Sequence, residues 1–226
     1  MANLLKKILG QRPKYVYKDR FKTREDAALS AQNIRDYGSK SYDSRSVKNL
    51  KFDEKYTQGR SMIVPLILST LDEGRYTILD IGGGVNAVFS HLNEVQKALH
   101  QCLVLERTEV IQSLNKKIPE KYNKNIHYIS SIDNVEAIDI AYFGSSVQYI
   151  EDYETLLNRI STLSPQFIIF SESIFTNADE DYFVMQINMF PDVFPNRFVS
   201  EKKLIKLMKN LCYQCTYNKL VAGDFS

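Results

Sequence analysis

The sequence predicts an α/β fold: a doubly wound, mostly parallel sheet preceded by a helical segment. Short apolar runs rich in Ile and Val alternate with helical segments from residue 61 onward, which is typical of a parallel sheet covered on both faces. One of these runs, residues 77–81, ends in three consecutive glycines, as a buried strand does where it turns into a helix. A content of 44% hydrophobic residues in a chain of 226 residues supplies a core for one such domain.

The expected elements follow from these patterns in chain order. Apolar residues at helical spacing predict helices, and Thr23 and Thr108 stand where an N-cap is expected. The predicted helices cover residues 23–36, 61–72, 87–98, 108–117, 152–163 and 201–211. Short β-branched runs predict strands at residues 77–81, 102–105, 126–129, 138–143, 167–170 and 213–220. Residues 176–198 are expected to form a long loop, and such loops in compact domains are usually functional.

Two parts are expected, a helical extension of residues 1–60 and a core of residues 61–226. Residues 15–60 are polar and rich in tyrosine, so we expect helices and loops without a core of their own, closing over the second part as a lid. Residues 1–14 place four apolar side chains at helical spacing among basic residues. This pattern fits peripheral contact with an anionic membrane surface and, more commonly, packing on the chain's own domain or on a partner subunit.

Charge and cysteine content disfavour several classes of protein. A net charge of +2, with Lys and Arg spread along the chain, disfavours a nucleic-acid partner. No apolar run reaches the length of a membrane span, and no signal peptide is visible. Three cysteines favour reduced thiols in a cytoplasmic protein. Cys212 and Cys215 have the spacing of a metal or redox motif, but no second Cys or His pair accompanies them, so no metal is expected. The oligomeric state stays open.

The three glycines after the first core strand predict a nucleotide-type site, because backbone N–H groups can approach a ligand where no Cβ intervenes. Two interpretations compete. Gly82-x-Gly84-x-x-Ala87, with Glu106 further on, satisfies the dinucleotide fingerprint of an NAD-dependent oxidoreductase. Asp80, two residues before Gly82, would repel a pyrophosphate. It suits a cationic cofactor without phosphate, and S-adenosylmethionine is such a cofactor.

The same stretch resembles the first motif, D/E-x-G-x-G-x-G, of Rossmann-like S-adenosylmethionine-dependent methyltransferases, although Asn86 stands in place of the third glycine. Residues 138–152, Tyr42-Asp43 and residues 195–198 are similar to segments of one bacterial methyltransferase family, often associated with surface-polysaccharide loci. The resemblance implies a Rossmann-like methyltransferase core, S-adenosyl-L-methionine as cofactor, and O-methylation of a sugar or glycan precursor. Only six residues follow the last predicted strand. They are too few for the closing strand of that fold, so we expect a truncated chain or a sheet one strand short.

Ligands of an open α/β sheet bind at the carboxyl ends of the strands, near the point where the strand order reverses. This rule and the resemblance select as cofactor-binding residues Asp80, Gly82, Gly83, Gly84, Glu106, Ser131, Gly144 and Ser145. Glu106 ends the second strand and can accept both ribose hydroxyls, whereas Ser131 either faces the adenine or belongs to a turn. The catalytic candidates are Glu172, Tyr149 and His91, with Glu172 first as the base that an oxygen acceptor needs. The acceptor-binding candidates are Tyr42, Gln148 and Arg197.

Two other functions stay open beside the methyltransferase. One is the NAD-dependent oxidoreductase of the dinucleotide fingerprint. The other is a non-catalytic cofactor-binding or scaffold protein, which Asn86, the short C-terminus and the lack of an obvious base would suit. The sequence leaves the methyl acceptor and its position unnamed.

Overall fold

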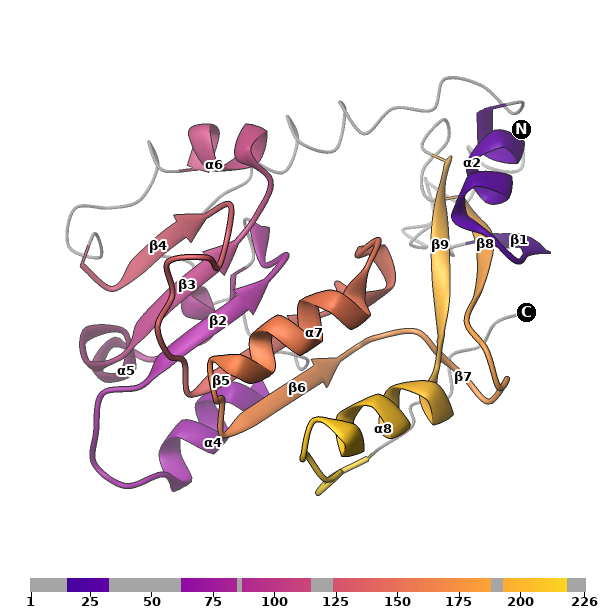
Figure 1. Ribbon diagram of the computed structural model, residues 1–226. Helices are drawn as coiled ribbons and strands as arrows, with labels where there is room; N and C mark the ends of the chain where they lie inside the picture. Colours follow the sequence, from indigo (N-terminus) through magenta and orange to yellow (C-terminus); the bar gives the residue numbers. More distant parts are fainter. Residues whose placement is uncertain (1–15, 33–61, 85–86, 115–123, 188–192, 219–226) are drawn as a thin grey trace, which may run out of the picture.

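The computed structural model describes residues 16–32, 62–84, 87–114, 124–187 and 193–218. Its main sheet has five parallel strands in the order β4-β3-β2-β5-β6 (Figure 1). The strands are β2 (Thr77–Ile81), β3 (Gln101–Leu105), β4 (Ile126–Ile129), β5 (Ile140–Gly144) and β6 (Phe167–Ser171). The chain runs outward through β3 and β4 and then returns to the other side of β2. The predicted fold class is confirmed, and the switch point lies at the carboxyl end of β2.

Helices cover both faces of this sheet because its strands are apolar on both sides. Ile78 of β2 packs with residues of α4 (Ile63–Thr70), η3 (Val88–His91) and α6 (Thr108–Leu114) on one face. Leu79, its neighbour on β2, packs with residues of α7 (Tyr153–Thr162) and α8 (Glu201–Asn210) on the other. The period of two along the strand therefore separates two buried clusters.

The predicted helix over residues 87–98 is wrong as a single helix. It is divided into η3 and α5 (Glu94–Leu99), and Asn93 caps α5. The Asn93 side chain accepts a bond from the Gln96 backbone N–H at 2.9 Å, and the Gln96 side chain accepts one from the Asn93 N–H at 3.2 Å. This capping box restarts the helix inside an apolar pattern that looks continuous. The next helix, α6, begins at Thr108 as predicted. The predicted cap at Thr108 is wrong, because the carbonyl of Arg107 accepts the first backbone bonds of the helix.

A second sheet stands beside the main one, in the order β1-β8-β9-β7 (Figure 1). Its strands are β1 (Val16–Phe21), β8 (Tyr182–Ile187), β9 (Val193–Ser200) and β7 (Phe175–Thr176). The expected long loop over residues 176–198 is therefore wrong, because most of it forms two paired strands. Residues 213–218, the described part of the last predicted strand, form no strand. Cys212 and Cys215, which lie just after the end of α8, are free and exposed.

The N-terminal segment contributes to this second sheet. Residues 16–21 were expected as helix or loop, but β1 pairs antiparallel with β8. The helix α2 (Arg24–Gln32) follows, and its predicted cap is confirmed: Thr23 Oγ1 accepts a bond from the Asp26 N–H at 3.1 Å. Ala31 of α2 is buried against Met185 and Val193, so this segment has a small core that its polar composition concealed.

None of the described helices is long and apolar enough to cross a bilayer. Residues 1–14, Tyr42 and Asn86 lie outside the described residues, as does most of the predicted lid.

Candidate functional site

The glycine turn leaves β2 with a backbone that only glycine adopts easily. Gly82 and Gly84 have φ angles of +71° and +54°. The Gly82 N–H donates to the Leu105 carbonyl at 2.9 Å, so the turn lies across the end of β3. A Cβ on Gly82 would stand 3.0 Å from Ser146 Cβ at the end of β5. The turn therefore lies between the two strands that flank the switch point.

Asp80 supports this turn from behind. The side chain is 1% exposed, and its Oδ2 accepts a bond from the Val88 N–H at 2.6 Å. A Cβ on Gly83 would stand 2.3 Å from the same oxygen, so glycine is required there for the carboxylate to fit. The carboxylate therefore accepts the first N–H of η3, and this bond connects Asp80, before the turn, to Val88, after it.

Glu106 faces the turn from the carboxyl end of β3, as predicted. Its Oε1 would lie 3.3 Å from a Cβ on Gly84, so the carboxylate lies next to the turn. Its Oε2 accepts a bond from the Arg107 N–H at 3.1 Å. The side chain is partly exposed, which leaves this carboxylate within reach of a ligand.

Tyr128 is a contact that the sequence did not identify. Its hydroxyl, at the carboxyl end of β4, donates to the Gly84 carbonyl at 3.1 Å. A tyrosine at the penultimate position of residues 126–129, a strand that begins and ends in isoleucine, was the available signal. Burial, and then the nearby Cys102, Asp80 and Glu106, raise the pKa of the Tyr128 phenol far above its usual value of 10, so the hydroxyl stays protonated.

The segment after β5 folds back on itself. Ser145 has a φ of +57°, an uncommon conformation for a residue with a side chain, and its N–H donates to the Ser171 carbonyl at 2.7 Å. Gln148 Nε2 donates to both the carbonyl and the hydroxyl of Ser145 at 3.1 Å. A Cβ on Gly144 would stand 2.7 Å from the Tyr142 ring, so this glycine makes room for that ring.

Two polar atoms in this segment have no partner among the described residues. They are Ser146 Oγ and Gln148 Oε1, and both are buried. Ser146 Oγ lies 3.7 Å from the position of a Cβ on Gly82. Buried polar atoms are nearly always paired, and unpaired ones commonly mark a place that a ligand or water completes.

The three catalytic candidates take different positions. Glu172 follows β6 with a φ of +49° and is exposed, and the register pairs its neighbour Ser171 with Gly144. Glu172 therefore lies at the same edge as Ser145. Tyr149 donates its hydroxyl proton to Gln186 Oε1 at 3.2 Å, which connects it to the second sheet and does not suit a base. His91 ends η3 and is half-buried.

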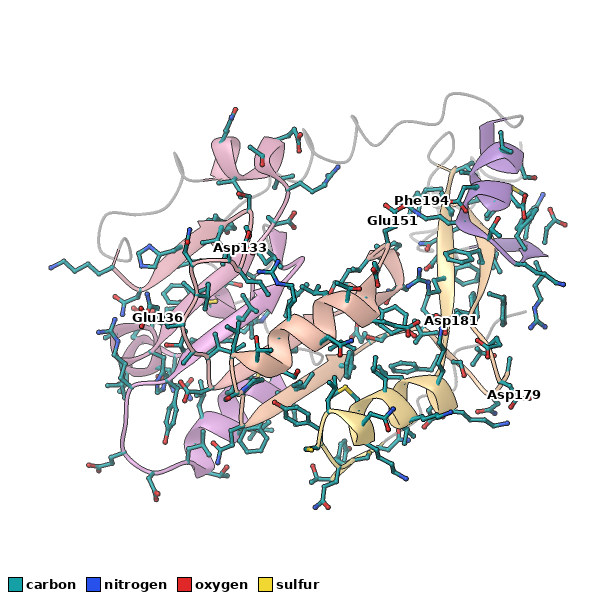
Figure 2. The ribbon with its side chains drawn as sticks, viewed as in Figure 1. Asp133, Glu136, Glu151, Asp179, Asp181 and Phe194 are labelled. Atoms are coloured by element: carbon teal, nitrogen blue, oxygen red, sulfur yellow. The ribbon has the colours of Figure 1, made fainter. Side chains whose placement is uncertain are left out.

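Ser131 belongs to a closed turn after β4. Its hydroxyl donates to Asp133 Oδ2 and accepts a bond from the Asp133 N–H at 3.1 Å. Asp133, labelled in Figure 2, follows β4, and its carboxylate pairs with Arg159 of α7. The Ser131 hydroxyl, followed by Arg159, lowers the pKa of Asp133. Ser131 was expected either to face the adenine or to belong to a turn. In the structure its hydroxyl is bonded within the turn.

Arg197 of β9 is built into the protein. It is 8% exposed, and its two terminal nitrogens donate to the carbonyls of Ile150 at 3.1 Å and Glu151 at 2.7 Å. The guanidinium lies between the rings of Tyr153 and Phe183, at 5.0 and 4.9 Å from their centroids. These contacts join the second sheet to the loop that precedes α7. Arg197, which was predicted to bind the acceptor, therefore has a structural role in this protein.

A cavity of about 270 Å³ borders the Arg197 side chain. Its wall combines aromatic rings with charges of both signs, from Lys22, Glu151, Asp152, Tyr153, Glu154, Glu180, Asp181, Phe183, Arg197 and Lys203. Several of these charges are paired: Lys203 Nζ lies 2.6 Å from Glu154 Oε1, and Arg197 Nε lies 3.8 Å from Asp181 Oδ2. Figure 2 marks Glu151 and Asp181, which both belong to this wall.

No protein-family model matches this chain, and no curated protein matches it. Several solved structures are similar to it in part. A protein from Pyrococcus horikoshii is 15% identical, with a TM-score of 0.49 over 76% of this chain and 90% of that one. The 1,6-didemethyltoxoflavin-N1-methyltransferase of Burkholderia thailandensis, bound to 1,6-didemethyltoxoflavin and S-adenosylhomocysteine, is 18% identical, with a TM-score of 0.44 over 88% and 87%. The precorrin-6y C5,15-methyltransferase of Geobacter metallireducens is 15% identical, with a TM-score of 0.37 over 52% of this chain. This chain spans 64% of the length of the precorrin-6y enzyme, a little under two thirds.

Proposed function

We propose that this chain is an S-adenosylmethionine-dependent methyltransferase. The observation that carries the proposal is the position of the Glu106 carboxylate next to the Gly82–Gly84 turn, at the carboxyl ends of the two neighbouring strands β2 and β3. A carboxylate held beside a glycine turn at the switch point can accept both hydroxyls of a ribose. The unpartnered Ser146 Oγ next to the turn, and Gln148 Oε1 two residues further on, add acceptors for a donor-bearing ligand.

The surroundings of the turn favour this cofactor over a dinucleotide. A pyrophosphate needs free N–H groups at a helix N-terminus. Here Asp80 already accepts the Val88 N–H, and its charge would repel a phosphate. The helix that follows, η3, has only four residues and so contributes a small dipole. S-adenosylmethionine has a sulfonium and an ammonium group and no phosphate, which suits a turn flanked by Asp80 and Glu106.

In this proposal the chain's own residues position the reactants. Glu106 would accept the ribose hydroxyls, and the backbone of residues 82–84 would lie against the cofactor. When bound, S-adenosylmethionine supplies an electrophilic methyl group to a nucleophile. Glu172, exposed at the same edge as Ser145, would take the proton of the acceptor hydroxyl. Positioning of the two reactants accounts for much of the rate enhancement in such a displacement.

The acceptor that we propose is a hydroxyl of a sugar or glycan precursor, in surface-polysaccharide biosynthesis. The resemblance of residues 138–152 to the family found at such loci suggests it. The cavity beside Arg197 supports it, since aromatic rings and carboxylates are the groups that bind sugar faces and hydroxyls. Residues 16–32 of the predicted lid are built into the second sheet, and the rest of the predicted lid, with Tyr42, would close over this side.

Calorimetric titration with S-adenosylhomocysteine tests the cofactor assignment. The wild-type chain should bind it, and Glu106→Ala should lose about 1.5–3 kcal/mol of binding free energy, because a charge-assisted hydrogen bond is removed. That loss corresponds to roughly a tenfold to hundredfold weaker affinity. Glu109→Ala, an exposed carboxylate in the first turn of α6, is the matched control and should bind like the wild type. Binding of NAD in place of S-adenosylhomocysteine would favour the oxidoreductase, and equal affinity in the Glu106 variant would remove that residue from the site.

A further inference from the structure

The glycine turn at the proposed cofactor site needs an external support. Glycine loses more conformational freedom on folding than any other residue, so three in succession do not hold one shape by themselves. Gly82 is held by its N–H bond to the Leu105 carbonyl at 2.9 Å. Gly84, which lies next to Glu106, is held through its carbonyl by the Tyr128 hydroxyl at 3.1 Å.

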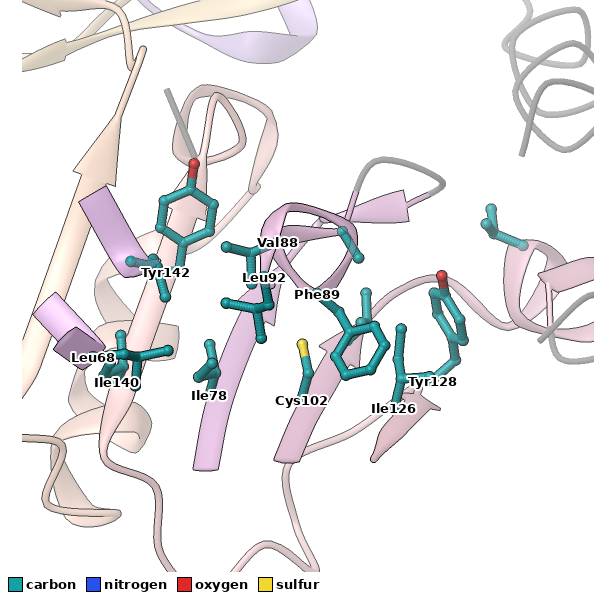
Figure 3. Packing of buried hydrophobic residues seen from close by; sticks show 14 residues of the cluster. Leu68, Ile78, Val88, Phe89, Leu92, Cys102, Ile126, Tyr128, Ile140 and Tyr142 are labelled. Atoms are coloured by element: carbon teal, nitrogen blue, oxygen red, sulfur yellow. The ribbon is translucent and has the colours of Figure 1, made fainter. Parts of the chain in front are cut away.

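Tyr128 is well placed to provide this support. The residue is 7% exposed and belongs to the buried cluster on one face of the main sheet, where Figure 3 shows its ring beside Ile126. A packed ring fixes the position of its hydroxyl. Burial and the nearby Asp80 and Glu106 carboxylates raise the pKa of the phenol, so the proton that Gly84 accepts is always present.

We propose that Tyr128 is a positioning residue of the cofactor site. Its hydroxyl holds the Gly84 carbonyl, and Gly84 in turn holds the Glu106 carboxylate in the orientation that accepts the ribose hydroxyls. The inference rests on the proposed function, because it assigns Tyr128 a role in presenting Glu106 to the ribose of the ligand. It predicts that Tyr128 acts through Glu106 and makes no contact of its own with the ligand.

Tyr128→Phe tests the proposal, since phenylalanine keeps the ring and removes the hydroxyl. Titration with S-adenosylhomocysteine should give an affinity about three- to tenfold weaker, the range expected for one neutral hydrogen bond. Tyr76→Phe is the matched control. Its hydroxyl also donates to a backbone carbonyl, that of Asp72 at 2.8 Å, but it lies before the amino end of β2. The Tyr76 bond is exposed, so the control should lose less stability, and it should lose no affinity.

A double-mutant cycle distinguishes positioning from a general loss of stability. In the Glu106→Ala background, Tyr128→Phe should weaken binding no further, because the carboxylate through which it acts is absent. Gly84→Ala is a second route to the same result, since a Cβ there would crowd the carboxylate and strain a positive φ. Additive losses in the cycle, or wild-type affinity in Tyr128→Phe, would overturn the proposal.

The same titrations separate this inference from the proposed function. Adenosine and NAD also contain a ribose, so either serves as the probe if S-adenosylhomocysteine does not bind. Binding of NAD alone, with the same coupling between Tyr128 and Glu106, would refute the methyltransferase and support the positioning role. If the wild-type protein binds none of the three ligands, both proposals fail.

Discussion

Replacing Arg197 by methionine should destabilise the whole protein. The guanidinium makes charge-assisted hydrogen bonds to two backbone carbonyls, at 3.1 and 2.7 Å, and the side chain is 8% exposed. Each such bond contributes about 1.5–3 kcal/mol. Methionine keeps the packing between the two flanking rings but leaves both carbonyls without this donor and Asp181 without the positive charge 3.8 Å away. Taking the lower value for each bond, we expect a loss of about 3 kcal/mol in the free energy of unfolding, which lowers Tm by roughly 6–12 °C in a chain of this size.

Urea denaturation and thermal melting measure this loss. Arg159→Met is the control, because Arg159 makes an exposed ion pair with Asp133, and such pairs contribute less than about 1 kcal/mol. The affinity for S-adenosylhomocysteine should stay the same in both variants, since Arg197 lies in the second sheet. An Arg197→Met protein that melts with the wild type, yet binds or turns over its acceptor poorly, would refute the structural role. That result would instead support the predicted role of Arg197 in binding the acceptor.

Three further predictions concern the turn, the pH dependence and the base. Asp80→Ala leaves the Val88 N–H without an acceptor and should cost about 1–3 kcal/mol of unfolding free energy. Asp80→Asn keeps an acceptor oxygen and should cost less, and an equal loss in urea melts would contradict this reasoning. Burial lowers the pKa of His100 below its usual 6.5, and its Nδ1 accepts the Tyr76 N–H at 3.3 Å. The unfolded chain therefore takes up the proton first, and stability should fall as the pH drops below about 6.5. His100→Gln should reduce this slope, and an unchanged slope would exclude His100 as its cause. Glu172→Gln should lower kcat on the native acceptor about 100-fold or more without changing cofactor affinity, and full activity would exclude Glu172 as the base.

The main sheet and the position of Glu106 beside the glycine turn were predictable because their signals are local. Each strand from β2 to β6 is a short, mostly apolar run that ends in, or is followed by, glycine or a polar residue, and the order of such runs indicates a parallel sheet. Glu106 was identifiable from its position alone, since the carboxyl end of a second strand lies beside that of the first. Thr23 was recognisable as a cap because capping depends on residues three positions apart.

The second sheet was not predictable by the same means. The segment Pro195-Asn196-Arg197 resembles a turn, because proline and polar residues are rare in central strands. In the structure β7 pairs with β9 only at Val199 and Ser200, so the other side of β9 has no described strand neighbour at Pro195. Asn196 is fully buried, with its amide bonded to Gln186 of β8. A polar residue is buried when its partner comes from elsewhere in the chain, and a pattern within one segment carries no information about that partner.

The pairing of β1 with β8 has a consequence for how this chain reaches its structure. Val16 and Ile187 are partners roughly 170 positions apart, whereas β2 to β6 are made in between and can pair with one another as they leave the ribosome. The strand β1 therefore stays without its partner β8 while the main sheet assembles. Its centre carries Lys18, Asp19 and Arg20, all exposed, and charged residues on an unpaired strand discourage aggregation with other chains. The polar composition that hid this strand from prediction thus protects it during synthesis, until its partner has emerged.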